Sequence, residues 1–405
     1  MPLCRTLLAL LACASVGLGA ELRTLKGDVR KGEVKSITAK EVVLSADGKD
    51  VITPLAEVLQ IDYAPAGKPP ADAKWADVEL TDGTLLHCGA FAIKGKQVEL
   101  KLLAGPEVKL PLTAVANVLN DAQVEKYRKE WTSRLAKKRR RDVVAILRKS
   151  ETNPDGVVNP LEGTLGEGDE EGKAIAFTLS AGGRKVTFGL DKVHGLIFQR
   201  ELDPKAPSVV CKVRDTLQDV VYASAVASTP AGVTLTTPSG ATIEYKKDLL
   251  AQLDYSKGKL EFLSKMEPVK VVETSTEDQV YHYQRDTNLD RTGDLRVGGE
   301  TYKLGLAIHS HTELEYDLKG DFREFKAVVG IDDNVGGHPG PVVLRIEGDG
   351  KELYSRTLTR KDKEKVKEKV TLNIKDVQRL RIVVTSGELL DLGKHIDLAD
   401  AQVSK

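Results

Sequence analysis

The sequence predicts a mainly β protein in which small, duplicated, strand-rich units precede one larger β-sandwich. Three observations lead to this prediction. A closing motif recurs four times in the first 255 residues. Short runs of alternating apolar and polar residues are separated by Asp-Gly and similar turns. The motif stops near Met266, and strands with glycine turns continue to the end. The hydrophobic content of 41% is enough for folded cores.

The charge balance excludes one class of protein. The chain has 60 Lys and Arg residues against 60 Asp and Glu residues. A protein that coats nucleic acid needs a basic excess, so we expect no nucleic-acid partner. With 405 residues, the chain is long enough for two to four compact domains.

The first residues are predicted to be a targeting segment, a signal peptide over 1–20. Arg5 supplies the positive start, and Thr6–Ala12 is a short apolar stretch. We expect cleavage after Ala20; the alternative is lipid attachment at Cys13, because the residues before it loosely resemble a lipobox. The apolar stretch is too short to span a bilayer. The mature chain is therefore expected to lack a transmembrane segment and to be secreted, periplasmic or at the cell surface.

The closing motif has a regular spacing. Its copies start at Val51, Val108, Val186 and Ile243, which are 57, 78 and 57 residues apart. This spacing indicates a two-unit block that was duplicated whole. The end of each copy has apolar residues three positions apart, which predicts a single helical turn followed by a final strand.

Each repeat is predicted to contain several short strands, one helical turn and a last strand. That order resembles SH3-like and Sm-like small barrels. Sm-like barrels can bind RNA, but the charge balance argues against this role here. Barrels this small are marginally stable alone, so we expect them to pack in pairs and to act as spacer or protein-contact modules. The predicted barrels cover 21–66, 75–120, 157–200 and 207–262.

A helical connector is predicted over 121–150, between the two blocks. Its apolar residues follow helical spacing: Val124, Tyr127, Trp131, Leu135, Val143, Ile146 and Leu147. Lys137–Arg141 is the strongest basic run, interpreted as a solvated stretch; the alternative is contact with an anionic envelope polymer or membrane headgroups. Cys88 and Cys211 are expected to be small buried thiols in different domains.

The C-terminal region, 268–405, is predicted to be a β-sandwich. Asp349-Gly350 is a typical hairpin turn within it. The candidate strands are Leu314–Leu318, Phe325–Gly330, Val342–Glu347, Val370–Ile374 and Leu380–Thr385.

The same region carries motifs that resemble a known family. They are Tyr302–Ser310, Tyr316–Gly320, Phe325–Asp333, Val343–Lys351 and Leu380–Val384. Their order and content resemble the NPCBM family of carbohydrate-binding modules, over about a third of the chain. The resemblance implies a galactose-binding-like jelly roll and a sugar ligand.

One position departs from the family pattern. Such modules usually close with an acidic residue followed by Trp-Ala-Asp, whereas this chain has Asp397, Leu398, Ala399 and Asp400. If the tryptophan belongs to the core, Leu398 only packs less area. If it belongs to the site, sugar contact is weakened.

Sugar sites combine a flat ring with polar side chains. The ring candidates are Tyr281, Tyr283, Tyr302, Tyr316 and Tyr354, and His338 is a further polar candidate. The predicted carbohydrate-binding residues are Tyr302, His309, His311, Tyr316, Asp332, Asp333, His395 and Asp397.

Two alternatives concern metals. Asp332 and Asp333 are candidate calcium ligands, because Ca²⁺ takes oxygen ligands; the alternative is an acidic turn that caps a strand. His309 and His311 would alternate onto one face of a strand, where they could bind zinc or form structural hydrogen bonds. Calcium is the one cofactor that the sequence suggests.

No enzyme is predicted, because the sequence contains none of the motifs G-x-S-x-G, H-E-x-x-H or a P-loop. The leading hypothesis is a secreted, non-catalytic, carbohydrate-binding protein of bacteria whose partner is a polysaccharide or glycoconjugate. One alternative is a structural component of the cell envelope that binds a protein partner and no sugar. The other is an accessory subunit of a separate glycosidase.

Overall fold

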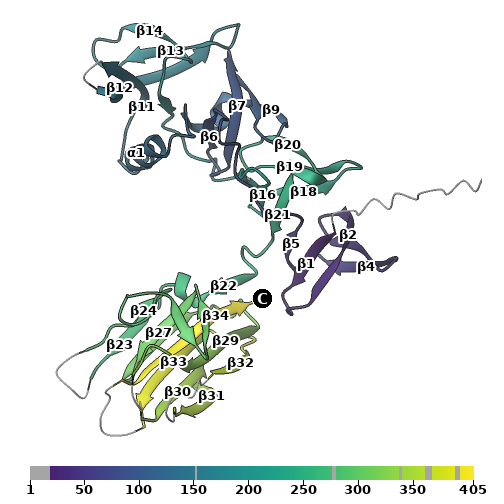
Figure 1. The fold of residues 1–405 in the computed structure, drawn as a ribbon, viewed down its shortest axis with the longest axis vertical. Helices are drawn as coiled ribbons and strands as arrows, with labels where there is room; N and C mark the ends of the chain where they lie inside the picture. Colours follow the sequence, from purple (N-terminus) through teal and green to yellow (C-terminus); the bar gives the residue numbers. More distant parts are fainter. Residues whose placement is uncertain (1–18, 151–152, 276–279, 337–339, 361–366, 388–392) are drawn as a thin grey trace, which may run out of the picture. The chain divides into compact units, whose positions relative to one another are not determined.

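The chain is mainly β, as predicted, and divides into two compact units after Tyr255 (Figure 1). We call them the repeat unit, which ends at Tyr255, and the sandwich unit, Ser256–Lys405. The computed structural model describes residues 19–150, 153–275, 280–336, 340–360, 367–387 and 393–405. The segment 1–18, with Cys13, lies outside them.

One strand-pairing pattern recurs through the repeat unit. In the first repeat, each of the first three strands pairs antiparallel with the next, and the fifth strand returns to pair with the first. The strands are β1 (Ala20–Thr24), β2 (Val29–Ile37), β3 (Glu41–Ala46), β4 (Lys49–Pro54) and β5 (Val58–Asp62). The predicted cleavage site, after Ala20, therefore falls at the first residue of β1.

The same order of pairing occurs three more times among the described residues. In the fourth copy the second strand is broken into β17 and β18. Single 3₁₀ turns, η1 (Leu112–Ala114) and η2 (Lys247–Leu249), precede the final strands of the second and fourth copies, as the motif predicts. The strands are β6 (Ala76–Leu80), β7 (Leu85–Lys94), β8 (Gln97–Leu102), β9 (Glu107–Pro111), β10 (Val115–Leu119), β11 (Asp142–Ser150), β12 (Asn153–Gly168), β13 (Ala174–Leu179), β14 (Lys185–Gly189), β15 (Gly195–Ile197), β16 (Cys211–Asp215), β17 (Val220–Ala223), β18 (Ala225–Ser228), β19 (Gly232–Thr236), β20 (Thr242–Lys246) and β21 (Leu250–Asp254).

The repeats join through their final strands. β5 pairs with β21, so the first repeat meets the fourth, and β10 pairs with β15, so the second meets the third. Ile61 lies opposite Leu253, and Val118 lies opposite Leu196. All four residues hold the same position in the closing motif. Each junction therefore joins equivalent strands antiparallel, which covers edges that would otherwise expose unpaired backbone groups.

A second seam between the second and third repeats depends on glycine. The backbone N–H of Gly168 donates to the carbonyl of Gly95 at 2.9 Å, and the N–H of Gly95 donates back at 3.2 Å. A Cβ on Gly168 would lie 1.8 Å from the carbonyl oxygen of Ile93, which is rigid backbone. The seam therefore requires a residue without a side chain here.

We expect Gly168→Ala to lower the free energy of unfolding of the repeat unit by about 1–3 kcal/mol, because the two backbones must move apart. Urea unfolding followed by circular dichroism measures the change. Gly89→Ala is the control, because its Cβ would make only an ordinary 3.5 Å contact with Leu103. Equal destabilisation by both variants would contradict this account of the seam.

The connector over 121–150 differs from the prediction of one helix. Helix α1 covers only Glu125–Leu135, where Tyr127 and Trp131 are buried. Asp142–Ser150 is strand β11, which pairs with β12 and with β15. The run Val143–Leu147 is apolar throughout, and partner strands on both sides outweigh its helical spacing. The basic residues 137–141 lie between α1 and β11.

The sandwich unit packs two main antiparallel sheets face to face. One sheet has the order β24-β27-β34-β29-β32, with β22 added to β34; the other has the order β23-β28-β33-β30-β31. All five predicted strands are present, with ends shifted by three residues or fewer. The strands are β22 (Leu260–Phe262), β23 (Lys270–Glu273), β24 (Gln284–Arg285), β27 (Gly305–His309), β28 (Thr312–Asp317), β29 (Glu324–Ile331), β30 (Val342–Gly348), β31 (Lys351–Leu358), β32 (Lys367–Asn373), β33 (Arg379–Ser386) and β34 (His395–Ser404).

The boundary between the units corrects one prediction. The sequence predicts that the fourth repeat ends at residue 262 and that the sandwich begins at residue 268. Instead, Ser256 begins the sandwich unit, because β22 supplies an edge strand that pairs with β34. Cys88 and Cys211 are buried thiols that form no disulfide within the described residues, as predicted, and they belong to the second and fourth repeats.

Candidate functional site

The candidate site lies on the outer face of the six-stranded sheet. Side chains alternate along β34, so Ile396 and Leu398 point into the core between the sheets. His395 and Asp397 point to the opposite face. On neighbouring β27, His309 lies directly opposite His395 in the strand register. The outer face therefore gathers polar side chains at the ends of two central strands.

A covering segment buries most of this face. The hairpin of β25 (Leu295–Val297) and β26 (Glu300–Tyr302) lies beside β34 and β29. A small apolar cluster contains Leu289, Leu295 and Ala307, with Tyr281 and Tyr302 packed against it. As a result, the exposed fraction is 1% for His309 and 0% for Asp397.

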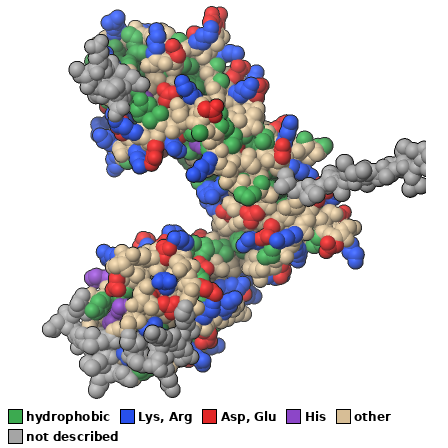
Figure 2. Space-filling model, viewed as in Figure 1, with side chains coloured by type: hydrophobic (Ala, Val, Ile, Leu, Met, Phe, Trp, Pro, Cys, Tyr) green, Lys and Arg blue, Asp and Glu red, His purple; other side chains and the backbone are tan. Residues whose placement is uncertain are grey.

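Three rings form the centre of the site. Tyr281 stacks on His309 with ring centroids 4.5 Å apart and an interplanar angle of 27°. The His395 ring lies 5.1 Å from that of His309 and 5.9 Å from that of Tyr281. Tyr281 and His395 keep partial exposure, and histidine side chains reach the surface of the sandwich unit in Figure 2. We call Tyr281, His309, Asp332, His395 and Asp397 the outer-face site.

The electrostatics favour uncharged groups. Burial, aided by His309, lowers the pKa of His395 to about 4, against the opposing charge of Asp290. Burial raises the pKa of Asp397 well above its usual range, and the charge of Asp332 adds to this rise. At neutral pH, His395 is therefore a neutral imidazole that can donate one hydrogen bond and accept another.

Asp397 is an unusual buried carboxyl. Neither of its oxygens has a hydrogen-bond partner among the described residues. The nearby backbone of Arg296 lowers the pKa of Asp397, but burial outweighs this effect. Buried polar atoms are normally paired. Asp397 is therefore an exception, one that it shares with other described groups of the sandwich unit such as the Ser310 and Tyr316 hydroxyls.

The two aspartates predicted to bind calcium have separate roles. Asp332 Oδ1 accepts hydrogen bonds from the backbone and side-chain N–H groups of Asn334, both at 2.8 Å. Asp333 Oδ2 accepts the backbone N–H of Gly299 at 2.6 Å. In the described parts of the chain, no group of three or more His, Cys, Asp or Glu residues is arranged to hold a metal. Calcium binding stays a prediction, and His338 lies outside the described residues.

Three other residues predicted to bind sugar lie outside the outer-face site. His311 does not share a strand face with His309, because β27 ends at His309 and His311 adopts a left-handed φ of 61°. Tyr316 cannot face a ligand, because it is fully buried in the core. Tyr302 lies in the covering hairpin beside Tyr281, and its hydroxyl donates to Glu300 at 2.7 Å.

Leu398 belongs to the core. It is fully buried between the two sheets and points away from the outer-face site. Of the two readings of the departure from the family pattern, the structure supports the first. Leucine at this position reduces packed area and leaves the site residues in place.

The fold and the family comparison together identify the class of domain at the C-terminal end of the described chain. The sandwich carries a partly exposed tyrosine ring and a neutral imidazole side by side on the outer face of one sheet. Residues 261–404 match the NPCBM/NEW2 domain, so this part of the chain is an NPCBM domain. No curated protein matches the chain.

Several solved structures are similar to the chain. One is CBM51 from Clostridium perfringens GH95 in complex with methyl-galactose: it is 22% identical, has a TM-score of 0.31, and the match covers 36% of this chain and 99% of that chain. Another is the pair of tandem CBM51 modules of Sp3GH98, the family 98 glycoside hydrolase from Streptococcus pneumoniae SP3-BS71, at 15% identity and a TM-score of 0.32, covering 95% and 87%. A third is CBM51-2 in complex with GlcNAc and INT domains from Clostridium perfringens ZmpB, at 18% and 0.32, covering 45% and 44%.

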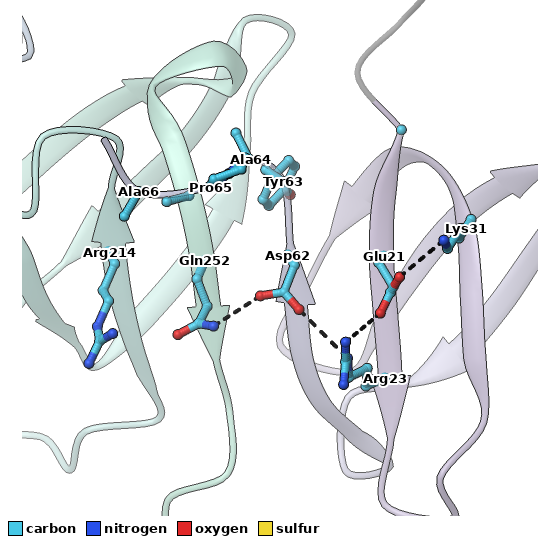
Figure 3. Close-up of a pocket in the computed structure, with 12 residues that line it drawn as sticks. Glu21, Arg23, Lys31, Asp62, Tyr63, Ala64, Pro65, Ala66, Arg214 and Gln252 are labelled. Atoms are coloured by element: carbon cyan, nitrogen blue, oxygen red, sulfur yellow. Dashed lines mark hydrogen bonds and ion pairs between the residues drawn. The ribbon is translucent and has the colours of Figure 1, made fainter. Parts of the chain in front are cut away.

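The junction of the first and fourth repeats holds a pocket of about 470 Å³ (Figure 3). Four of its charged side chains, Glu21, Arg23, Lys31 and Asp62, are paired with one another, and Arg214 lines it as well. Glu21 bridges Arg23 at 2.6 Å and Lys31 at 3.4 Å, and Gln252 donates to Asp62 at 2.9 Å. These partners leave few polar groups free for a ligand. Among the described residues, no helix is long and apolar enough to cross a membrane.

Proposed function

We propose that the chain is a secreted, non-catalytic, carbohydrate-binding protein. Its sandwich unit binds a polysaccharide or glycoconjugate at the outer-face site, and its repeat unit is a spacer or protein-contact module. The NPCBM match over 261–404 supports a sugar ligand. The observation that carries the position of the site is the stack of Tyr281 on His309 beside His395.

Each residue has a distinct part in this proposal. Tyr281 offers the ring face that is not covered by His309, and a sugar ring can lay its C–H face there. His395 exchanges hydrogen bonds with sugar hydroxyl groups as a neutral imidazole. His309 and Asp397 are too buried to touch the ligand. His309 is a positioning residue, because its ring packs against both Tyr281 and His395.

We expect Tyr281→Ala in the full chain to weaken glycan binding at least about tenfold, which corresponds to about 1.4 kcal/mol. Tyr281→Phe keeps the ring and should retain most of the affinity. A glycan array and pull-down on insoluble polysaccharides, each with and without Ca²⁺, identify the ligand and test calcium dependence. Calorimetry with the identified sugar then compares the variants.

Two outcomes would count against the proposal. A folded wild-type chain that binds no glycan in either condition would favour an envelope protein that binds a protein partner. Unchanged binding by folded Tyr281→Ala would leave the sugar function intact and move the site elsewhere. Leu398 lies in the core, so leucine in place of tryptophan removes no contact group from the outer-face site.

A further inference from the structure

We propose that the repeat unit carries a second ligand site, a groove between the second and third repeats that binds a neutral oligosaccharide. The groove has a volume of about 740 Å³ and lies in a different unit from the outer-face site. It is lined by the middle of β7 and by the turns that join β12 to β13 and β14 to β15. Its size falls within the range of about 300–1,000 Å³ that small-ligand sites have.

The walls of the groove are held in place from two sides. On one side, β10 pairs with β15, and the side-chain amide of Asn120 donates to the carbonyls of Leu190 and Val193, both at 2.9 Å. On the other side, the N–H of Ile93 donates to the carbonyl of Gly172 at 3.2 Å. A Cβ on Gly172 would lie only 2.8 Å from the Cβ of Ala92, so the two walls are in contact there and leave no room for a side chain at residue 172. The concave surface is thus formed before any ligand arrives.

Two aromatic side chains line the groove, Trp75 and Phe91. Both are partly exposed. The indole N–H of Trp75 donates to Asp77 at 3.0 Å, and its ring lies 5.6 Å from the ring of His87 at a tilt of 54°. These contacts fix the orientation of the indole, which suits a platform for the apolar face of a sugar better than a freely rotating ring does.

The charges around the groove indicate a neutral, hydroxyl-rich ligand. Asp121, Glu171 and Asp191 line it together with Lys74 and Lys173. Glu171 and Lys173 pair with each other at 2.9 Å, so much of the charge cancels. Carboxylates accept hydrogen bonds from hydroxyl groups. A peptide strand is less suited, because β7 is already paired with β6 and β8 on both sides and offers no free edge.

Tryptophan fluorescence gives a direct test in the full chain. The protein has two tryptophans, and Trp131 is only 4% exposed, so acrylamide quenching reports mainly on Trp75. Neutral hexasaccharides of glucose, xylose, mannose and N-acetylglucosamine are the probes. We expect at least one of them to protect the fluorescence in a saturable manner. Phe91→Leu, which keeps an apolar side chain without the ring, should weaken that protection about tenfold or more.

Matched variants separate this site from the outer-face site. Ile52→Ala is the surface control, because Ile52 is 60% exposed in the first repeat, away from the groove lining. Tyr281→Ala should weaken binding at the outer-face site and leave the protection of Trp75 unchanged. The inference is overturned if no hexasaccharide protects Trp75, or if folded Phe91→Leu is protected as well as wild type. Protection by a proline-rich decapeptide alone would overturn the sugar class.

Discussion

Replacing Tyr316 with alanine should destabilise the sandwich unit by about 3–5 kcal/mol, the cost of removing a large buried ring. Tyr316 has no exposed surface and lies in the core with Leu314, Phe325 and Ile382. Urea unfolding, followed by a probe specific to the sandwich unit such as amide NMR signals, measures the change.

Tyr316→Phe separates packing from the hydroxyl group. The Tyr316 hydroxyl is buried and has no hydrogen-bond partner in the part of the chain that the structure describes, and burial raises its pKa well above the usual range. Phenylalanine keeps the ring and removes an unpaired polar atom, so we expect equal or greater stability. Glycan binding should be unaffected, because this residue lies between the sheets. Loss of binding in a stable Tyr316→Phe variant would return Tyr316 to the site.

Strand alternation in the sequence contained the information that Tyr316 is a core residue. Leu314, Tyr316 and Leu318 alternate with Glu315 and Asp317, which predicts one buried face. The same alternation in β34 places Leu398 in the core and Asp397 on the other face. Local periodicity thus assigns faces well where a strand has one apolar side.

Long-range pairing is the part that local patterns could not predict. The closing motif aligned Ile61, Val118, Leu196 and Leu253 as equivalent residues, but it did not tell which repeats meet. Tertiary contacts decide that the first repeat joins the fourth and the second joins the third. They also turn the apolar run of β11 into a strand, because partner strands flank it on both sides.

The sequence predicts the polar residues of the candidate site but not which ring and which charge lie beside them. His309, His395 and Asp397 are among the predicted polar site residues, and strand alternation places these three on the outer face. Tyr281 is one of five equivalent ring candidates, and Asp290 ends an oxygen-rich stretch, Asp286–Asp290, that the sequence predicts to be a turn. Both belong to the segment that precedes the covering hairpin, and only the folded chain shows that the charge of Asp290 reaches His395.

The repeat unit should lose stability as the pH rises above about 4, because of an acidic cluster between the second and fourth repeats. Asp219 Oδ1 accepts the backbone N–H of His87 at 2.6 Å, and the N–H of Asp219 donates to Asp215 Oδ1 at 2.8 Å. His87 Nδ1 lies 2.6 Å from Asp77, and the hydroxyl of Tyr245 donates to Asp219 at 3.5 Å. Both Asp215 and Asp219 are only 1% exposed.

The direction of this pH dependence follows from proton binding. Burial, then the charges of Asp215 and Asp77, raise the pKa of Asp219 well above its usual range. In the unfolded chain an aspartate has a pKa of about 3.9, so above that pH the unfolded state has released a proton that the folded state keeps. The contribution of Asp219 is therefore complete below about pH 4 and is lost as the pH rises through its folded pKa. The slope for one proton is at most about 1.4 kcal/mol per pH unit.

Asp219→Asn should remove this dependence. The amide oxygen of the variant side chain would still accept the N–H of His87, and its N–H₂ can donate to the hydroxyl of Tyr245. The variant therefore keeps both hydrogen bonds but removes the ionisable carboxyl of Asp219. We expect the variant to be more stable than wild type at pH 8, with an advantage that shrinks steadily toward pH 5. Urea unfolding of the repeat unit at pH 5, 6, 7 and 8 measures this trend. Asp72→Asn, at an exposed loop position, should shift stability equally at every pH. An Asp219→Asn effect that is the same at pH 5 and pH 8 would show that Asp219 is ionised in the folded chain throughout this range.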